Sequence, residues 1–238
     1  MINSTVVCSE VGEDKMAPYK LFNFVLIMSI SLVGILGNLL VILTFSRQKR
    51  RTSATTFLKN LATFDIFLII STNLFAHRYA YTLVFPKSWV DHMTAGKLTI
   101  GVLPISYICQ SFSTWTVVAV ALDRYIHVCH PLKAMKWCRI KIANKVVLGI
   151  VIISVVYNIP RFFEYYKILQ VAKEAIDPCT GYFLTPANSL GANEIYKYSY
   201  AFGMYMTVMY ALPLGSLLFF NGKLIKKLNS LALIINLS

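Results

Sequence analysis

Residues 21–45 read LFNFVLIMSISLVGILGNLLVILTF, an apolar run that contains no charged side chain. A helix needs about 20 mostly apolar residues to cross the ~30 Å hydrocarbon core of a bilayer. This run is long enough to cross with some tilt, so it predicts a transmembrane helix. Residues 1–20 are more polar and lack the pattern of a cleaved signal peptide, so we expect them to remain outside the bilayer.

Four further apolar segments follow along the chain. Across the whole sequence 57% of residues are hydrophobic and 14% are charged, with a mean hydropathy of +0.61. A soluble helical bundle would need amphipathic helices with polar outer faces, whereas several of these segments are apolar on every side. The sequence therefore predicts an all-α, polytopic transmembrane bundle over residues 21–227. Its spans are expected at about residues 21–46, 57–84, 97–127, 141–163 and 195–224.

Basic side chains indicate which side of the membrane is cytoplasmic. Lys and Arg fill the connections after the first and third spans and the segment after the fifth, where Asp123 is the only acidic residue. Because Lys and Arg concentrate on the cytoplasmic side, we expect residues 1–20 outside and residues 228–238 as a short cytoplasmic tail. The formal net charge of +13 is then a topology signal that also favours anionic lipid, not a nucleic-acid footprint.

Two features of the outside segments fit a plasma-membrane protein. Asn3-Ser4-Thr5 is a glycosylation sequon, and it falls on the side assigned as extracellular. The longest outside connection, residues 161–197, contains Cys179. Two interpretations of that connection remain open: it lies over the bundle and shapes a ligand entrance, or it only connects two spans.

Three of the polar side chains within the predicted spans could lie at similar depth: Asn38 in the first, Asp65 in the second and Ser113 in the third. Ionisable groups in a span usually mark a function or a specific partner. A carboxylate there must be protonated, paired or hydrated. Two interpretations remain open: a site for a small hard cation such as sodium, and a hydrogen-bond cluster that only sets helix packing.

An acid and a base close the third span, in Asp123-Arg124-Tyr125. At the inner interface such a pair can hold the helix end in one state, until the acid is protonated or the base meets a new partner. The motif is followed by Pro131-Leu132 and a basic loop. Its position after a long uncharged segment carries more information than the tripeptide itself.

The four histidines give no support to an enzyme. None of His77, His92, His127 and His130 is paired with a Ser or Cys nucleophile at helical spacing. His127 and His130 share a helix face with Cys129 nearby, but interface histidines in a basic loop explain this pattern better than a metal site. We therefore expect no catalytic residues and no metal other than sodium.

Several short motifs occur together in an order that is specific to one family. They are Gly37-Asn38, Leu61-Ala62 with Asp65, Asp123-Arg124-Tyr125, Pro131-Leu132 and Pro213. In this order and in these spans, over nearly the whole chain, the set resembles rhodopsin-like (class A) G-protein-coupled receptors. The end of the fourth span, YNIPRFFE at residues 157–164, is most similar to invertebrate FMRFamide-type neuropeptide receptors.

The resemblance implies a receptor for an extracellular peptide that signals to a heterotrimeric G protein, with receptor oligomers as further partners. It implies a cytoplasmic switch and inner loop that meet the G protein, a sodium site, a ligand pocket, and a proline that distorts the fifth span. For the switch and the inner loop the implied residues are Asp123, Arg124, Tyr125, Pro131 and Leu132. For the sodium site they are Asn38, Asp65 and Ser113, and for the ligand pocket they are Ser106, Tyr107, Gln110 and Cys179. The distorting proline is Pro213.

The sequence also departs from the family pattern. In the family, a disulfide usually joins a cysteine at the place of Cys179 to a cysteine at the outer end of the third span, where this chain has Thr99. Cys109 lies about ten residues, or ~15 Å along a helix, further into the membrane. We therefore predict no standard bridge, which leaves Cys179 free or paired with Cys8. Ile150 and Asn221 stand where the family usually has a tryptophan and a tyrosine.

The residues after Lys227 are too few to form a sixth span. An alternative function follows from this: a non-signalling, truncated receptor variant that associates with a full-length receptor. A transporter or channel is the weakest reading, because the sequence shows neither inverted repeats nor several charges within the spans.

Overall fold

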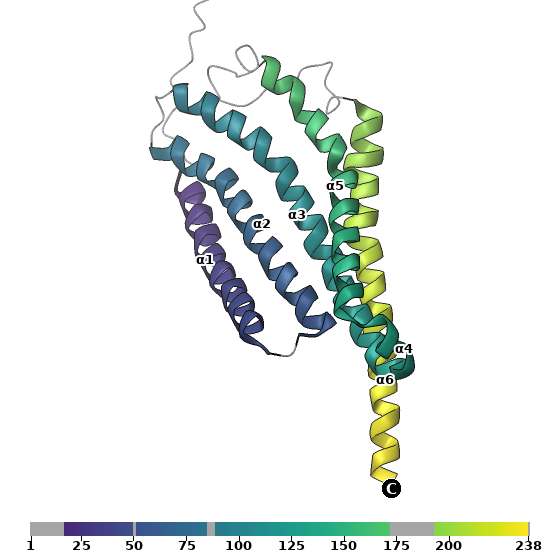
Figure 1. Cartoon of the computed structure of the whole chain (residues 1–238). Coiled ribbons are helices and arrows are strands. Elements are labelled where there is room, and N and C mark those ends of the chain that lie inside the picture. The colour runs from purple at the N-terminus through teal and green to yellow at the C-terminus, as the bar shows by residue number, and fades with distance from the viewer. Residues whose placement is uncertain (1–16, 50, 85–88, 172–192, 238) are drawn as a thin grey trace, which may run out of the picture.

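The computed structural model describes residues 17–49, 51–84, 89–171 and 193–237, and within these ranges every element is helical. Two π-helical segments, η2 and η3, lead directly into α6, so the last three elements form one long helix (Figure 1). The elements are α1 (Ala17–Arg47), α2 (Ser53–Val84), α3 (Trp89–Cys129), α4 (Pro131–Trp137), α5 (Ile140–Val171), η2 (Tyr196–Met204), η3 (Thr207–Ala211) and α6 (Leu212–Leu237).

The central helix of the bundle is α3, which packs against α2, α5 and α6. Figure 1 shows α1 beside α2 at one edge and the short α4 at the end of α3 that lies near the start of α5. Five helices are long and apolar enough to cross a membrane, which confirms the predicted polytopic bundle. Their apolar segments are Leu21–Arg47, Ser53–Leu74, Gly101–Cys129, Ile140–Phe163 and Tyr196–Ser230.

Apolar side chains cover the outside of the bundle, and the interior is small and partly polar. In the most apolar part of α1 no residue is buried. The largest fully buried side chain is Phe112 on α3, whose ring stacks on Phe64 of α2 with 3.7 Å between centroids. Thr116 and Asn158 are also buried. This distribution suits a lipid environment, where apolar groups gain nothing from leaving the surface and polar groups turn inward.

A close approach between α1 and α2 depends on Gly34. A Cβ atom at this position would lie 2.9 Å from Ile69 Cδ1, so any larger residue would push the isoleucine away. Gly37 has open space around its Cα among the described residues. Of these two glycines in the first span, Gly34 is therefore the one that sets the α1–α2 contact, as small residues commonly do between transmembrane helices.

The expected distortion of the fifth span lies immediately before Pro213, the second residue of α6. Proline has no N–H to donate to the preceding turn, and its ring clashes with that turn's carbonyl. The turn is η3, which is π-helical and carries the buried Met209. A wider turn removes the clash and directs Met209 toward α3, where it accepts a hydrogen bond from Ser111.

The helix ends differ in places from the sequence-based expectation. Residues 228–237, expected as a short tail, continue α6 as a helix. No Gly or Pro follows Gly222, so nothing in the local sequence stops the helix. The sequence analysis also did not foresee α4, which begins at Pro131, the first-turn position where proline is tolerated.

The stacked pair Phe112–Phe64 should be the main packing contact between α2 and α3. We expect Phe112→Ala to lower the free energy of unfolding by about 3–5 kcal/mol, because it leaves a cavity in the aromatic stack between α2 and α3. The melting temperature of the purified protein in detergent measures this. Phe22→Ala removes the same atoms from an exposed position on α1 and should change the melting temperature little. Equal shifts in both variants would contradict the packing described here.

Candidate functional site

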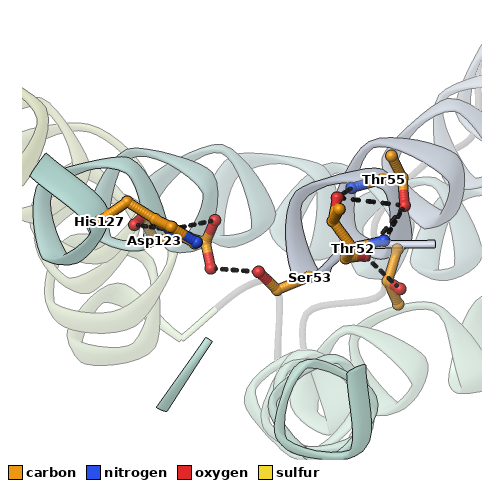
Figure 2. Close-up of polar contacts among 6 residues, drawn as sticks. Thr52, Ser53, Thr55, Asp123 and His127 are labelled. Carbon is orange, nitrogen blue, oxygen red and sulfur yellow. Dashed lines mark hydrogen bonds and ion pairs between the residues drawn. The ribbon is translucent and has the colours of Figure 1, made fainter. Parts of the chain in front are cut away.

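At the C-terminal end of α3, Asp123 is held by a side chain from the start of α2. Ser53 Oγ donates a 2.7 Å hydrogen bond to Asp123 Oδ1, and both residues are buried. His127, one turn further along α3, places Nδ1 2.8 Å from the Asp123 carbonyl oxygen and 3.4 Å from Oδ2. Figure 2 shows the Asp123 side chain between these two partners.

A reciprocal cap positions Ser53. The Thr55 backbone N–H donates to Thr52 Oγ1, and the Thr52 N–H donates to Thr55 Oγ1, as Figure 2 also shows. Each side chain thus satisfies a backbone donor at the helix start, in the manner of a capping box. The cap fixes where α2 begins, so Ser53 in its first turn points at Asp123. The sequence TSATT at residues 52–56 is therefore part of the site.

The expected pairing of Asp123 with Arg124 is absent from this structure. Asp123 is 5% exposed and turns into the bundle, whereas the Arg124 side chain is exposed. Among the described residues Arg124 makes no ion pair. Adjacent residues on a helix point about 100° apart, so a buried Asp123 leaves its neighbour facing outward. Ser53 and His127 hold the acid instead.

The Tyr125 side chain on α3 packs against the fifth span. Its ring lies 5.5 Å from that of Phe220, and its hydroxyl lies 3.3 Å from His130 Nε2. Pro131 begins α4, and Leu132 beside it is 80% exposed. This end of α3 therefore combines an exposed arginine with a short helix whose apolar side chains lie on the surface.

Cys138 follows α4 and lies near Asp123. Burial, together with the neighbouring Asp123 carboxylate, raises the pKa of the Cys138 thiol to about 11. The isolated thiol is therefore protonated at neutral pH. Cys109, Cys129 and Cys138 are all free. Cys8, Cys179 and Asn3 lie outside the described residues, so the predictions made for them stay predictions.

The structure brings Asp65 and Ser113 together in the middle of the bundle. The Asp65 carboxyl on α2 lies against the Ser113 side chain on α3. Ser113 Oγ is buried, yet no described atom meets hydrogen-bond geometry with it. The Asn38 amide nitrogen bonds instead to Gly34 O in its own helix, at 3.0 Å. A carboxylate and an unpartnered buried hydroxyl are oxygen donors of the kind that hard cations prefer, so this pair fits a small cation.

A buried arginine lies at the other end of α3, among tyrosine rings. Arg161 on α5 is 7% exposed, and its guanidinium carbon lies 4.7 Å from the Tyr107 ring centroid. The rings of Tyr200 and Tyr205 lie 5.3 and 5.7 Å from the same carbon. Tyr205 also donates a 3.0 Å hydrogen bond to Gln110 Oε1. We refer to Tyr107, Gln110, Arg161, Tyr200 and Tyr205 as the arginine–tyrosine cluster.

Two of the pocket residues proposed from the sequence belong to this cluster, Tyr107 and Gln110. Ser106 does not, because its hydroxyl donates to Val102 O in its own helix. Below the cluster, Asn158 Nδ2 donates to Ser111 Oγ at 2.9 Å and joins α5 to α3. Arg161 was missed as a site residue, although an ionisable group at the end of a predicted span is itself a signal of function.

Comparison with known proteins identifies the family. The model of the rhodopsin-family seven-transmembrane receptor matches residues 37–233, which is most of the chain. The chain belongs to this family. It is 32% identical to the FMRFamide receptor of Drosophila melanogaster over 92% of its own length and 40% of the relative's. It is 26% identical to an FMRFamide peptide receptor of Caenorhabditis elegans, over 84% and 44% of the two lengths.

A vertebrate relative extends the similarity. The thyrotropin-releasing hormone receptor of Gallus gallus is 28% identical over 89% of the chain and 50% of the relative. The chain thus spans half or less of the length of these curated relatives. As a rhodopsin-family chain with five apolar helices it is a multi-pass membrane protein, and its family is one of receptors rather than of enzymes.

The hydrogen bond from Ser53 should be the contact that fixes Asp123 in this receptor-family chain. We expect Ser53→Ala to lower the free energy of unfolding by about 1–3 kcal/mol, because a buried carboxylate oxygen loses its donor. Thermal unfolding in detergent measures the change. Ser29→Ala is the matched control, since the Ser29 hydroxyl is exposed and donates to Val25 O within α1. A Ser53→Ala variant as stable as the Ser29→Ala variant would show that the bond contributes nothing.

Proposed function

We propose that this chain forms the ligand-binding and transducing part of a plasma-membrane receptor for an extracellular peptide, which signals to a heterotrimeric G protein. The observation that carries the proposal is the family match together with two polar sites at opposite ends of α3. The arginine–tyrosine cluster lies toward one end, and the Asp123-Arg124-Tyr125 motif lies at the other. The relatives named above are, by name, receptors for FMRFamide and for thyrotropin-releasing hormone, which supports a peptide as the ligand.

The charge distribution supports an extracellular N-terminus. The helix ends that carry Arg47, Lys133 and Lys223 belong to the same end of the bundle as Asp123, where α4 packs on α3. Cytoplasmic ends of transmembrane helices are rich in Lys and Arg. The arginine–tyrosine cluster then faces the outside, where a peptide arrives.

The cluster has the chemistry that a peptide requires. A guanidinium presents several donors in a fixed plane and binds carbonyl and carboxylate oxygens, and it also stacks on aromatic rings. Tyrosine rings add apolar contact area with a polar tip. In this proposal Arg161 binds a peptide oxygen while Tyr107 and Tyr205 flank it, and Gln110 keeps the Tyr205 hydroxyl in place.

The inner end has the chemistry of a docking surface. Arg124 is exposed, and α4 carries three exposed apolar side chains, Leu132, Met135 and Trp137. Apolar groups exposed together outside the membrane spans mark contact sites for a partner protein. A peptide that prefers one arrangement of α3 against α5 and η2 would shift the population of that arrangement at the inner end as well.

A signalling assay with paired variants tests this proposal. The complete natural reading frame that contains these residues is expressed in cultured cells, and G-protein dissociation is followed while a panel of amidated neuropeptides, including FMRFamide, is applied. We expect at least one peptide to act. Arg161→Gln should then weaken peptide binding by about 10-fold or more, the effect of losing a charge-assisted hydrogen bond. Arg139→Gln makes the same charge change at the inner side and should leave peptide binding unchanged.

A second variant separates binding from signalling. Arg124→Ala should abolish G-protein dissociation and leave peptide affinity unchanged. A peptide that binds equally well to the Arg161→Gln variant would remove the arginine–tyrosine cluster from the ligand site. Undiminished signalling by Arg124→Ala would remove the proposed G-protein contact, and a failure of all peptides to bind would contradict the peptide-receptor function itself.

We also propose that a sodium ion is held between Asp65 and Ser113 when present. Its charge would balance the Asp65 carboxylate inside the membrane, where an unpaired charge is costly. Ser113 would supply a neutral oxygen, for which no atom of the described residues meets hydrogen-bond geometry.

Thermal unfolding in sodium or potassium chloride at equal ionic strength tests the sodium site without any peptide. We expect sodium to raise the melting temperature of the purified protein, because an ion that binds only the folded state stabilises it. Asp65→Asn and Ser113→Ala should lose this difference between the salts. Ser106→Ala should keep it, since the Ser106 hydroxyl bonds within its own helix. Sodium stabilisation that survives in Asp65→Asn would place the ion elsewhere.

A further inference from the structure

Three side chains with metal-binding atoms meet at the inner end of α3: Asp123, His127 and Cys138. Their ligand atoms, one carboxylate oxygen, one imidazole nitrogen and one sulfur, all lie within 4.8 Å of one another. Two of them come from α3, and Cys138 comes from the segment between α4 and α5. Neither the peptide site nor the sodium site proposed above uses this arrangement.

Only one of the two carboxylate oxygens of Asp123 accepts a hydrogen bond from the described residues. Oδ1 accepts the hydrogen bond from Ser53, which fixes the orientation of the group. Oδ2 is buried and has no hydrogen-bond partner among the described residues, and His127 Nδ1 lies 3.4 Å from it. The residue is 5% exposed. A buried carboxylate oxygen that lacks a hydrogen bond is costly unless a positive charge faces it.

His127 contributes a nitrogen whose partner can change. Its Nδ1 lies 2.8 Å from the Asp123 carbonyl oxygen, so it donates there when protonated. The imidazole side chain is 45% exposed. A shift of the proton to Nε2 would leave the Nδ1 lone pair directed at the cluster. The loss of one ordinary hydrogen bond, about 1 kcal/mol, is small compared with the binding energy of a metal ion.

The ligand set selects the metal. Thiolate, imidazole and carboxylate together are the ligands of zinc, whereas magnesium and calcium prefer oxygen alone. Ligand atoms around a tetrahedral zinc ion lie about 3.3–3.8 Å apart, as zinc–ligand bonds of 2.0–2.3 Å require. The distance of 3.4 Å between His127 Nδ1 and Asp123 Oδ2 already lies in this range, and since no two ligand atoms are more than 4.8 Å apart, side-chain rotations of His127 and Cys138 are enough to close the site. Three protein ligands leave the fourth position to water.

We propose that Asp123, His127 and Cys138 form a zinc-binding site that links the inner end of α3 to the segment between α4 and α5. Ser53 supports the site from outside, because its hydrogen bond to Oδ1 directs Oδ2 toward the ion. Zinc would occupy the position between the buried Oδ2 and the other two ligands. The proposal concerns these side chains alone and does not depend on the peptide or the G protein.

Nearby residues of the same types provide matched controls. Cys129 is a free thiol of intermediate exposure at the end of α3, outside the cluster. His130 contacts the Tyr125 ring and hydroxyl instead. The pair His127 and His130, which share a face in the sequence pattern, is therefore divided between two environments by the fold. Cys129→Ser and His130→Gln make the same chemical changes as Cys138→Ser and His127→Gln at positions that should not matter.

Zinc binding to the purified full chain in detergent tests the proposal. The protein is treated with a chelator, and Zn²⁺ is titrated in competition with a fluorescent zinc indicator. We expect Cys138→Ser and His127→Gln to weaken the tightest site by about 100-fold or more, since even losing a supporting residue typically costs 10–100-fold. Cys129→Ser and His130→Gln should bind zinc as the unaltered chain does.

Cobalt provides a readout that a merely structural role of Cys138 would not change. Co²⁺ in the site should give intense visible absorption with a sulfur-to-metal charge-transfer band, and Cys138→Ser should lose that band while Cys129→Ser keeps it. Helix content and the elution volume without metal check that each variant is folded. If Cys138→Ser does not fold, His127→Gln at its half-exposed position decides. Equal zinc affinity in the cluster and control variants, or no tight zinc site in the unaltered chain, would overturn the proposal.

Discussion

Hydrocarbon offers no hydrogen-bond partner, and this constraint determines which groups lie where in the chain. Every backbone donor and acceptor within a span must be satisfied inside the span itself, so each apolar segment forms a helix. Side chains then divide by polarity, with leucine and isoleucine outward and groups such as Thr116 and Asn158 inward. The helices are consequently held together by small residues, aromatic contacts such as the Phe64–Phe112 stack, and interhelical hydrogen bonds such as that between Asn158 and Ser111.

Because α3 lies at the centre, it takes part in every candidate site. Tyr107 in its N-terminal half lies under Arg161, Ser113 in its middle lies against Asp65, and Asp123 near its C-terminal end accepts a hydrogen bond from Ser53. Each of these partners belongs to α2 or α5. A change in how α3 packs on either neighbour would therefore alter these contacts together.

Sequence reasoning succeeded where one residue's chemistry was enough. An acidic residue in an apolar span must find a polar partner, and Asp65 does lie against Ser113. It did less well where a sequence neighbour and residues from elsewhere in the fold are both possible partners of one group. Asp123 and Arg124 are adjacent in sequence, yet the helix turns them apart, and Ser53 and His127 hold the acid. The arginine–tyrosine cluster was only half foreseen, because its arginine lies on a different helix from the residues proposed.

The sequence by itself determined the class of protein, the spans and the family, because apolar length and motif order are local properties of the chain. Only the tertiary structure decided which side chains meet. Cys138 lies near Asp123 because α4 returns the chain toward α3, while Cys129, closer in sequence, lies outside the cluster. Such pairings depend on helix rotation and on the path of connecting segments. Helix rotation is set by contacts as specific as Gly34 against Ile69, which residue spacing alone does not encode.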